Sequence, residues 1–165
     1  KFGGTSLLWN GVTEYSVAYW LNIANTFDYQ TPWMIEAGPA NWAYNDIRNS
    51  TTTTYNINFY AGPGATDLVS SSNLNEGQLY HIVSVVSGGP GSWVSSIYID
   101  GVLDASQALP GGPPTGLVDQ TYIGCFLEYD PYMDGGIDDI SFWSRALTQT
   151  EITTLAAKTS PLEYS

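Results

Sequence analysis

Alternation of apolar and polar positions is the clearest pattern in this chain, and it predicts β-strands. In the segment 16–23, Val17, Tyr19, Leu21 and Ile23 fall on one side and the residues between them fall on the other. This is the period of two that arises because successive side chains of a strand point to opposite faces. The segment is therefore predicted to be a strand with one apolar face.

Apolar runs and segments rich in Thr and Tyr extend the β pattern along the chain. Strands are predicted on these grounds over 32–37, 51–60, 121–126 and 136–143. The Gly38-Pro39 pair predicts a turn, and the stretch 41–49 that follows is expected to be a loop.

One hairpin is indicated by its turn residues. The predicted strands 80–87 and 93–99 flank Gly88-Gly89-Pro90-Gly91, a connection too rich in glycine to continue either strand. Asp100-Gly101 follows directly and predicts a tight turn. A loop that holds Pro110, Gly111, Gly112, Pro113 and Pro114 is expected before the β pattern resumes at Thr121.

Only the C-terminal end changes its period. Thr148-Gln149-Thr150-Glu151 has the form of a capping box, and Ile152 and Leu155 lie three apart, so a short helix is predicted there. A chain of 165 residues fits one domain, 1–165. The fold predicted is all-β, a two-sheet antiparallel β-sandwich with a short C-terminal helix.

Charge excludes some classes of partner. The formal net charge is −12, with sixteen acidic residues against four basic ones. Nucleic acid and anionic lipid are therefore not expected as partners, whereas cations, neutral sugars and basic proteins are compatible. Apolar runs stay well short of the roughly 20 residues that span a bilayer, and no signal-peptide pattern follows Lys1. The numbering is expected to begin after processing or inside a larger protein, and Cys125 is expected to be a buried, inert thiol.

Four segments, in this order, resemble a known superfamily. They are Tyr15-Ser16-Val17-Ala18-Tyr19-Trp20-Leu21, Gly77-Gln78-Leu79-Tyr80-His81-Ile82-Val83, Ile97-Tyr98-Ile99-Asp100-Gly101, and the segment from Gly136 to Leu147 followed by Glu151-Ile152. Together they are similar to the concanavalin A-like superfamily of laminin G and pentraxin domains. The resemblance implies a jelly roll and leaves the function open, since lectins, adhesion modules, enzymes and spacers share this sandwich.

An acidic loop raises the question of calcium. Glu128, Asp130 and Asp134 lie within seven residues, and together with Asp46 and backbone carbonyls they could supply the oxygen ligands of Ca²⁺. The run around Gly124 also resembles the calcium-binding run of pentraxins, although that family has Asp-Asn where this chain has Asn45-Asp46. A solvated acidic loop without metal is the alternative, and both stay open.

Asp138 is a separate candidate. Alternation in the closing strand places it on the face of Ile140 and Phe142, and a carboxylate turned toward a core needs partners. Backbone hydrogen bonds would satisfy it. A structural calcium, of the kind that the resemblance to glucanases implies, is the other candidate partner.

Aromatic side chains suggest contact with a ligand. Trp42, Tyr44, Tyr129 and Tyr132 stand near acids in predicted loops, and aromatic rings cover the apolar faces of sugars well. Trp33 is also counted among the loop aromatics, although it lies in the apolar run 32–37, whereas Trp20 and Trp143 are expected to pack in the sandwich.

Hydrolysis is the disfavoured hypothesis. Glu128 and Asp130 would project roughly 6.5–7 Å apart from one face of a strand, near the spacing of glycosidase carboxylates. The third acid of the glucanase motif is missing, and His81, on one face with Val83 and Val85, is expected to be packed.

We therefore predict a non-catalytic, lectin-like module, with calcium dependence as an open expectation. Its partners would be a glycan or glycoprotein, and other domains of the same larger protein. Its location would be extracellular, on a cell surface or on a virion. A structural or adhesion module that binds protein, such as a capsid or spike domain, is the main alternative, and a glycoside hydrolase comes third.

Overall fold

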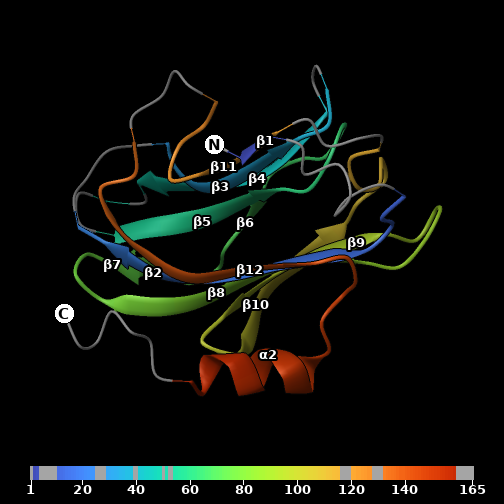
Figure 1. Ribbon diagram of the computed structural model, residues 1–165. Helices are drawn as coiled ribbons and strands as arrows, with labels where there is room; N and C mark the ends of the chain where they lie inside the picture. The colour runs from blue at the N-terminus through green and yellow to red at the C-terminus, as the bar shows by residue number, and fades with distance from the viewer. Residues whose placement is uncertain are drawn as a thin grey trace.

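The computed structural model describes residues 2–3, 11–24, 29–38, 41–49, 51, 54–115, 120–127 and 132–158. Two antiparallel sheets lie face to face, and the one helix of the described residues lies outside them (Figure 1). The chain therefore forms three layers: sheet A, sheet B and the helix.

Sheet A has the strand order β1-β11-β3-β4-β5-β6, and β7 also pairs with β5. Its strands are β1 (Phe2–Gly3), β3 (Gln30–Glu36), β4 (Trp42–Asn49), β5 (Thr54–Tyr60), β6 (Leu68–Val69), β7 (Leu74–Asn75) and β11 (Gln120–Ile123). All pairings within it are antiparallel.

Sheet B has the strand order β10-β9-β8-β2-β12. Its strands are β2 (Tyr15–Ile23), β8 (Leu79–Ser87), β9 (Val94–Ile99), β10 (Val102–Ala108) and β12 (Gly135–Trp143). Strands β8, β9 and β10 follow one another as hairpins, and β2 and β12, the first and last strands of sheet B along the chain, lie side by side.

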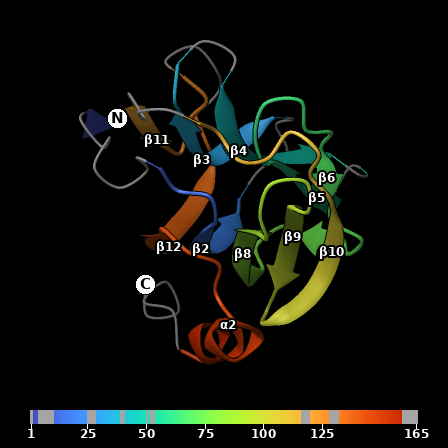
Figure 2. The same cartoon turned by 90° about the vertical axis from the view of Figure 1, so that its right-hand side faces the viewer.

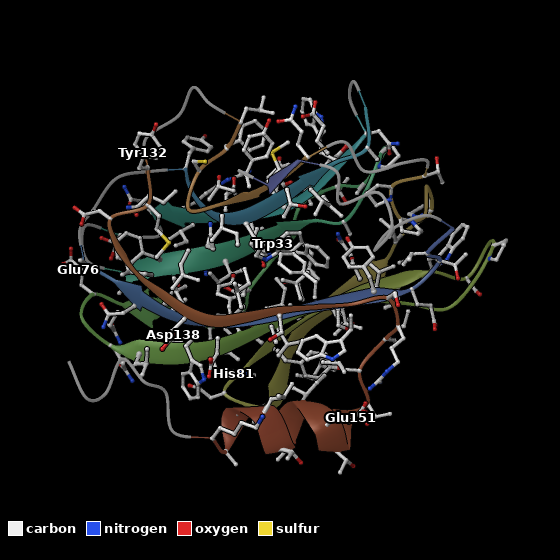
Figure 3. All side chains as sticks on the ribbon, in the orientation of Figure 1. Trp33, Glu76, His81, Tyr132, Asp138 and Glu151 are labelled. Carbon is white, nitrogen blue, oxygen red and sulfur yellow. The ribbon has the colours of Figure 1, made fainter. Side chains whose placement is uncertain are left out.

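The core lies between the sheets, where the apolar faces of the strands meet. Val17, Tyr19 and Leu21 of β2 point inward and are fully buried, and Trp33 of β3 lies between the two layers (Figure 3). The period of two seen in the sequence thus reflects one buried face for each strand. Trp33 belongs to the strand predicted over 32–37 and is a central core residue, so its inclusion among the loop aromatics is wrong.

Helix α2 (Gln149–Ala156) covers the outer face of sheet B (Figures 1 and 2). Thr148 caps it, because its side chain accepts the backbone N–H of Glu151 while the Glu151 side chain accepts the N–H of Thr148. The predicted capping box is confirmed. Ile152 of the helix packs against Val83 and other outward residues of the sheet in a second apolar cluster.

The predicted fold class is confirmed, as are the hairpin around 88–91 and the tight turn at Asp100-Gly101. Within the described residues, no helix is long and apolar enough to span a membrane. Cys125 is a free, half-buried thiol, where a buried one was expected.

One sequence prediction about strands is wrong, and the strand β10 was missed. The stretch 41–49, expected to be a loop, forms β4 in the middle of sheet A, with the polar residue Asn45 pointing into the core. The strand β10 was not predicted, because it is an edge strand that buries little and shows no apolar alternation.

The predicted orientation of Asp138 is also wrong. The register between β12 and β2 shifts between Asp138 and Ser141, and Asp139 takes a φ of +48° there. This bulge breaks the alternation. Asp138 pairs with Trp20 on the outer face of sheet B, whereas Ile140 and Phe142 pack against the core.

Candidate functional site

Four half-buried aromatic side chains meet on the outer face of sheet A; we call them the aromatic face. Tyr44 and Tyr60 stack with their ring centroids 5.2 Å apart and an interplanar angle of 15°. Phe126 meets Tyr44 edge to face at 5.1 Å and Trp42 at 5.7 Å. All four remain partly exposed, so the sheet presents a continuous row of rings toward solvent.

Strand register explains why these rings come together. Tyr44 of β4 and Tyr60 of β5 are direct partners across the two strands, so their side chains leave the sheet on the same face. Trp42 is two residues before Tyr44 and shares that face. Phe126 comes from the segment after β11, which lies on the other side of β3.

A short charged row continues the same face along β4. Arg48 donates from Nε and Nη2 to Asp46 Oδ2 at 3.1 and 3.0 Å, and its Nη2 lies 2.7 Å from Asp67 Oδ2. The guanidinium also lies over the ring of Tyr29, 5.2 Å from the ring centroid. Arg48 is thus held by two carboxylates and one ring.

These charges act on the aromatic face. Burial, followed by the negative charges of Asp46 and Asp67, raises the pKa of Tyr44 to about 12. Burial alone would lower the pKa of Arg48, but Asp46 and Asp67 outweigh it and raise that pKa above its usual value. Arg48 therefore stays charged at every physiological pH, and Tyr44 stays a neutral phenol.

Two hydrogen-bond donors on this side of sheet A have no partner among the described residues. They are Nε1 of Trp42 and Nδ2 of Asn58, and both atoms are buried. Asn58 is the cross-strand partner of Asp46 and is 2% exposed. Such atoms are rare in native proteins, since leaving a buried donor unpaired costs free energy.

The predicted ligand-contacting residues separate into three cases. Trp42 and Tyr44 both belong to the aromatic face. Tyr132 is 75% exposed, lies at one end of the sandwich (Figure 3), and makes no ring contact with the row among the described residues. Tyr129 lies outside the described residues.

The predicted metal ligands do not gather where the structure describes them. Glu128 and Asp130 lie outside the described residues. Asp46 is already bound to Arg48, and Asp138 lies on the outer face of the opposite sheet, where its Oδ1 accepts the N–H of Asp139 at 2.8 Å. Asp134 is exposed.

The calcium hypothesis stays untested, because Glu128 and Asp130, two of its predicted ligands, lie outside the described residues. No group of three or more His, Cys, Asp or Glu that could hold a metal occurs among those residues. The arginine that binds Asp46 is a poor neighbour for a cation. Of the two partners predicted for Asp138, a backbone N–H is present, donated by Asp139.

His81 lies on the far side of the sandwich, on the helix side of sheet B (Figure 3). Its ring packs against Trp20 with centroids 5.1 Å apart, and it lines a pocket of about 180 Å³ with Trp143 and Lys158. Burial and then the Lys158 charge lower its pKa to about 4. The expectation of a packed histidine is confirmed. Trp20 and Trp143 pack here on the outer face of sheet B.

Sequence reasoning missed four residues of the site: Tyr60, Phe126, Arg48 and Asp67. The first could have been found, because Tyr60 ends an alternating strand on the side opposite its apolar partners. Arg48 could have been found had 41–49 been interpreted as a strand. Phe126 and Asp67 reach the face through loop geometry, for which the sequence has no local signal.

Several solved structures share this fold. Domain 4 of AbnA, an extracellular GH43 arabinanase from Geobacillus stearothermophilus, superimposes with a TM-score of 0.69 at 22% identity, over 87% of this chain and 66% of that chain. A heptameric SAP-like pentraxin from Limulus polyphemus superimposes with a TM-score of 0.69 at 18% identity, over 88% of this chain and 70% of that chain. The CBM40 of the Ruminococcus gnavus IT-sialidase superimposes with a TM-score of 0.63 at 12% identity, over 88% of this chain and 84% of that chain.

Sequence comparison is decisive for the family, although no curated protein sequence matches. Residues 4–153 match the family described as the concanavalin A-like lectin/glucanases superfamily, under the name Laminin_G_3. The match covers nearly the whole chain and agrees with the sandwich described above. The chain therefore belongs to the concanavalin A-like lectin/glucanases superfamily.

Proposed function

We propose that this domain is a non-catalytic carbohydrate-binding module and that glycans bind on the aromatic face of sheet A. The observation that carries the proposal is the row formed by Trp42, Phe126, Tyr44 and Tyr60. These rings are held by one another and by the strands, yet remain partly open to solvent. A ligand meeting them loses water from apolar surface without first having to order the side chains.

The chemistry of the face suits sugars. Aromatic rings bury the C–H faces of a pyranose or furanose, and the phenol hydroxyls supply hydrogen bonds at the edges. Arg48 and Asp67 lie next to the rings with side chains 31% and 27% exposed, so a donor and an acceptor are within reach of a ligand's hydroxyl groups.

Solved relatives of the fold support the proposal. The arabinanase domain was solved with arabinotriose, and the CBM40 was solved with α2,3-sialyllactose. Both are extracellular or glycan-directed domains by their descriptions, and we extend to this chain a glycan or glycoprotein partner and a location outside the cell or on a surface. The chain spans 66% of the length of the arabinanase domain. We also propose that it acts together with other domains of a larger protein.

Calcium enters the proposal only through the loop of Glu128, Asp130 and Asp134. Because Asp46 is committed to Arg48, the aromatic face should bind glycans without a metal. Binding measured in EDTA and again in millimolar calcium tests this expectation. Recovery of the glycan unchanged after long incubation tests the assignment as non-catalytic.

The direct experiment is titration of the domain with arabinotriose, galactotriose and lactose, followed by NMR or calorimetry. Tyr60→Ala and Trp42→Ala should each weaken binding about tenfold or more, since each removes a ring from the row. Leu103→Ala, at an exposed position on the edge strand β10, is the control and should bind like the wild type.

Tyr132→Ala distinguishes the face from the loop at the end of the sandwich. We expect this change to leave the affinity unaltered. Loss of binding in Tyr132→Ala together with full binding in Tyr60→Ala would move the site to that loop. Absence of binding by any glycan would favour the protein-binding module instead.

A further inference from the structure

The aromatic face carries more negative than positive charge, and its one described cation is already neutralised. Arg48 is bound by Asp46 and Asp67 at distances between 2.7 and 3.1 Å. Two carboxylates thus surround one guanidinium. Glu36 adds a third carboxylate on the same face, because it pairs in register with Trp42.

Other described cations lie elsewhere. Arg145 is held by Glu151 at 2.7 Å beside the helix. Lys158 lines the pocket with His81 on the outer side of sheet B. Both are therefore on the opposite side of the sandwich from Tyr44, and neither can offset the carboxylates of the aromatic face.

The relatives of the fold do not settle which charge of ligand fits. Arabinotriose is uncharged, whereas sialyllactose carries a carboxylate. The charges on this chain's aromatic face distinguish an uncharged ligand from one that carries a carboxylate. An acidic sugar would have to displace Asp67 from Arg48, and it would still lie beside the carboxylate of Asp46.

We infer that the aromatic face selects uncharged glycans and rejects glycans that carry a carboxylate, and that Asp67 and Asp46 set this selectivity by occupying Arg48. The inference rests on the proposed function, since it concerns the same site. It assigns a substrate class: neutral oligosaccharides whose hydroxyl groups can share the exposed parts of Arg48 and Asp67.

Matched pairs of ligands test the inference. Lactose is compared with 3′-sialyllactose, and galactotriose with trigalacturonate, each by NMR titration at low salt. We expect the uncharged member of a pair to bind at least about fivefold more tightly, the size of one unscreened surface charge interaction. The difference should narrow as sodium chloride is raised, because salt screens exposed charges.

Each outcome separates the two proposals. Equal or tighter binding of the acidic members would overturn the inference and leave the carbohydrate-binding proposal standing. Binding of none of the four sugars, nor of arabinotriose, would overturn both.

Asp67→Asn tests the cause of the selectivity. This change frees one side of Arg48 and should bring the affinities for the neutral and acidic members of a pair within about twofold. Asp139→Asn makes the same change in net charge on the sheet B side, at an exposed residue with a φ of +48° that Asn accepts. The control should keep the wild-type ratio. An unchanged ratio in Asp67→Asn, with its melting temperature preserved, would refute the role of the carboxylates.

Discussion

Asn45 is a polar residue at the centre of the core, and its replacement is the sharpest test of what holds the two sheets together. The side chain is fully buried. Its Oδ1 accepts hydrogen bonds from Trp33 Nε1 at 2.7 Å, Ser84 Oγ at 2.7 Å and Tyr19 OH at 3.1 Å. Its Nδ2 donates to the carbonyl oxygen of Asn58 at 3.1 Å. Asn45 of β4 therefore hydrogen-bonds to residues of its own sheet A and to residues of sheet B.

Asn45→Ala should destabilise the domain by about 3–5 kcal/mol. Leaving a buried donor without an acceptor costs about 1–3 kcal/mol, and three donors share this one oxygen. The full sum is not expected, because the hydroxyls of Ser84 and Tyr19 can rotate toward other acceptors and water can enter the space. A loss of this size is a large part of the roughly 5–15 kcal/mol that stabilises a typical domain.

Urea unfolding of a double-mutant cycle measures the effect and its origin. Ser84→Ala alone should cost about 1 kcal/mol, the net value of one hydrogen bond. In the Asn45→Ala background the same change should cost nothing or stabilise, since the hydroxyl has already lost its acceptor. Additive costs, or an Asn45→Ala penalty below about 1 kcal/mol, would refute the shared-acceptor explanation.

Two further predictions concern pH and backbone geometry. His81 is the chain's one histidine, and because its pKa is lowered to about 4 by burial and the Lys158 charge, stability should fall as the pH drops from about 6.5 to about 4. An NMR titration midpoint near 6.5 would contradict this. Gly135→Ala should destabilise the domain by about 2–3 kcal/mol, because a Cβ there, at a φ of +149°, would collide with the Asn22 carbonyl oxygen. Gly77→Ala, at a φ of +69° with open space around it, is the control and should cost about 1 kcal/mol. Equal melting temperatures for the two variants would contradict the collision.

The sequence was sufficient for most of the fold because burial and hydrogen bonding leave local signs. Strands with one apolar face alternate visibly, as β2 does, and turns that need a positive φ call for residues such as Asp100-Gly101. Strand β10 left no sign, because an edge strand buries few side chains. The side of the sheet on which Asp138 lies was predicted wrongly for another reason. A bulge adds one residue to a strand, so alternation counted along the sequence assigns residues on its two sides to the wrong faces.

The candidate site was predicted only in part, and the reason lies in how its residues meet. Trp42 and Tyr44 were identified by residue type. Their neighbours Tyr60, Phe126 and Asp67 come from three other parts of the chain. Strand pairing brings in Tyr60, and the paths of two loops bring in Phe126 and Asp67. Contacts of that kind depend on register and loop path, which composition and periodicity do not specify.

Strand β4 shows why polarity misled the prediction and why it matters. Its side chains alternate between the core and the outer face, so Asn45 points inward to the donors of both sheets while Tyr44 and Asp46 point outward. The polar residues that suggested a loop therefore belong to two different sets: one hydrogen-bonds the two sheets together, and the other lies on the aromatic face. Because the same backbone carries both, the position of Tyr44 and Asp46 on the surface depends on the hydrogen bonds that Asn45 makes beneath them.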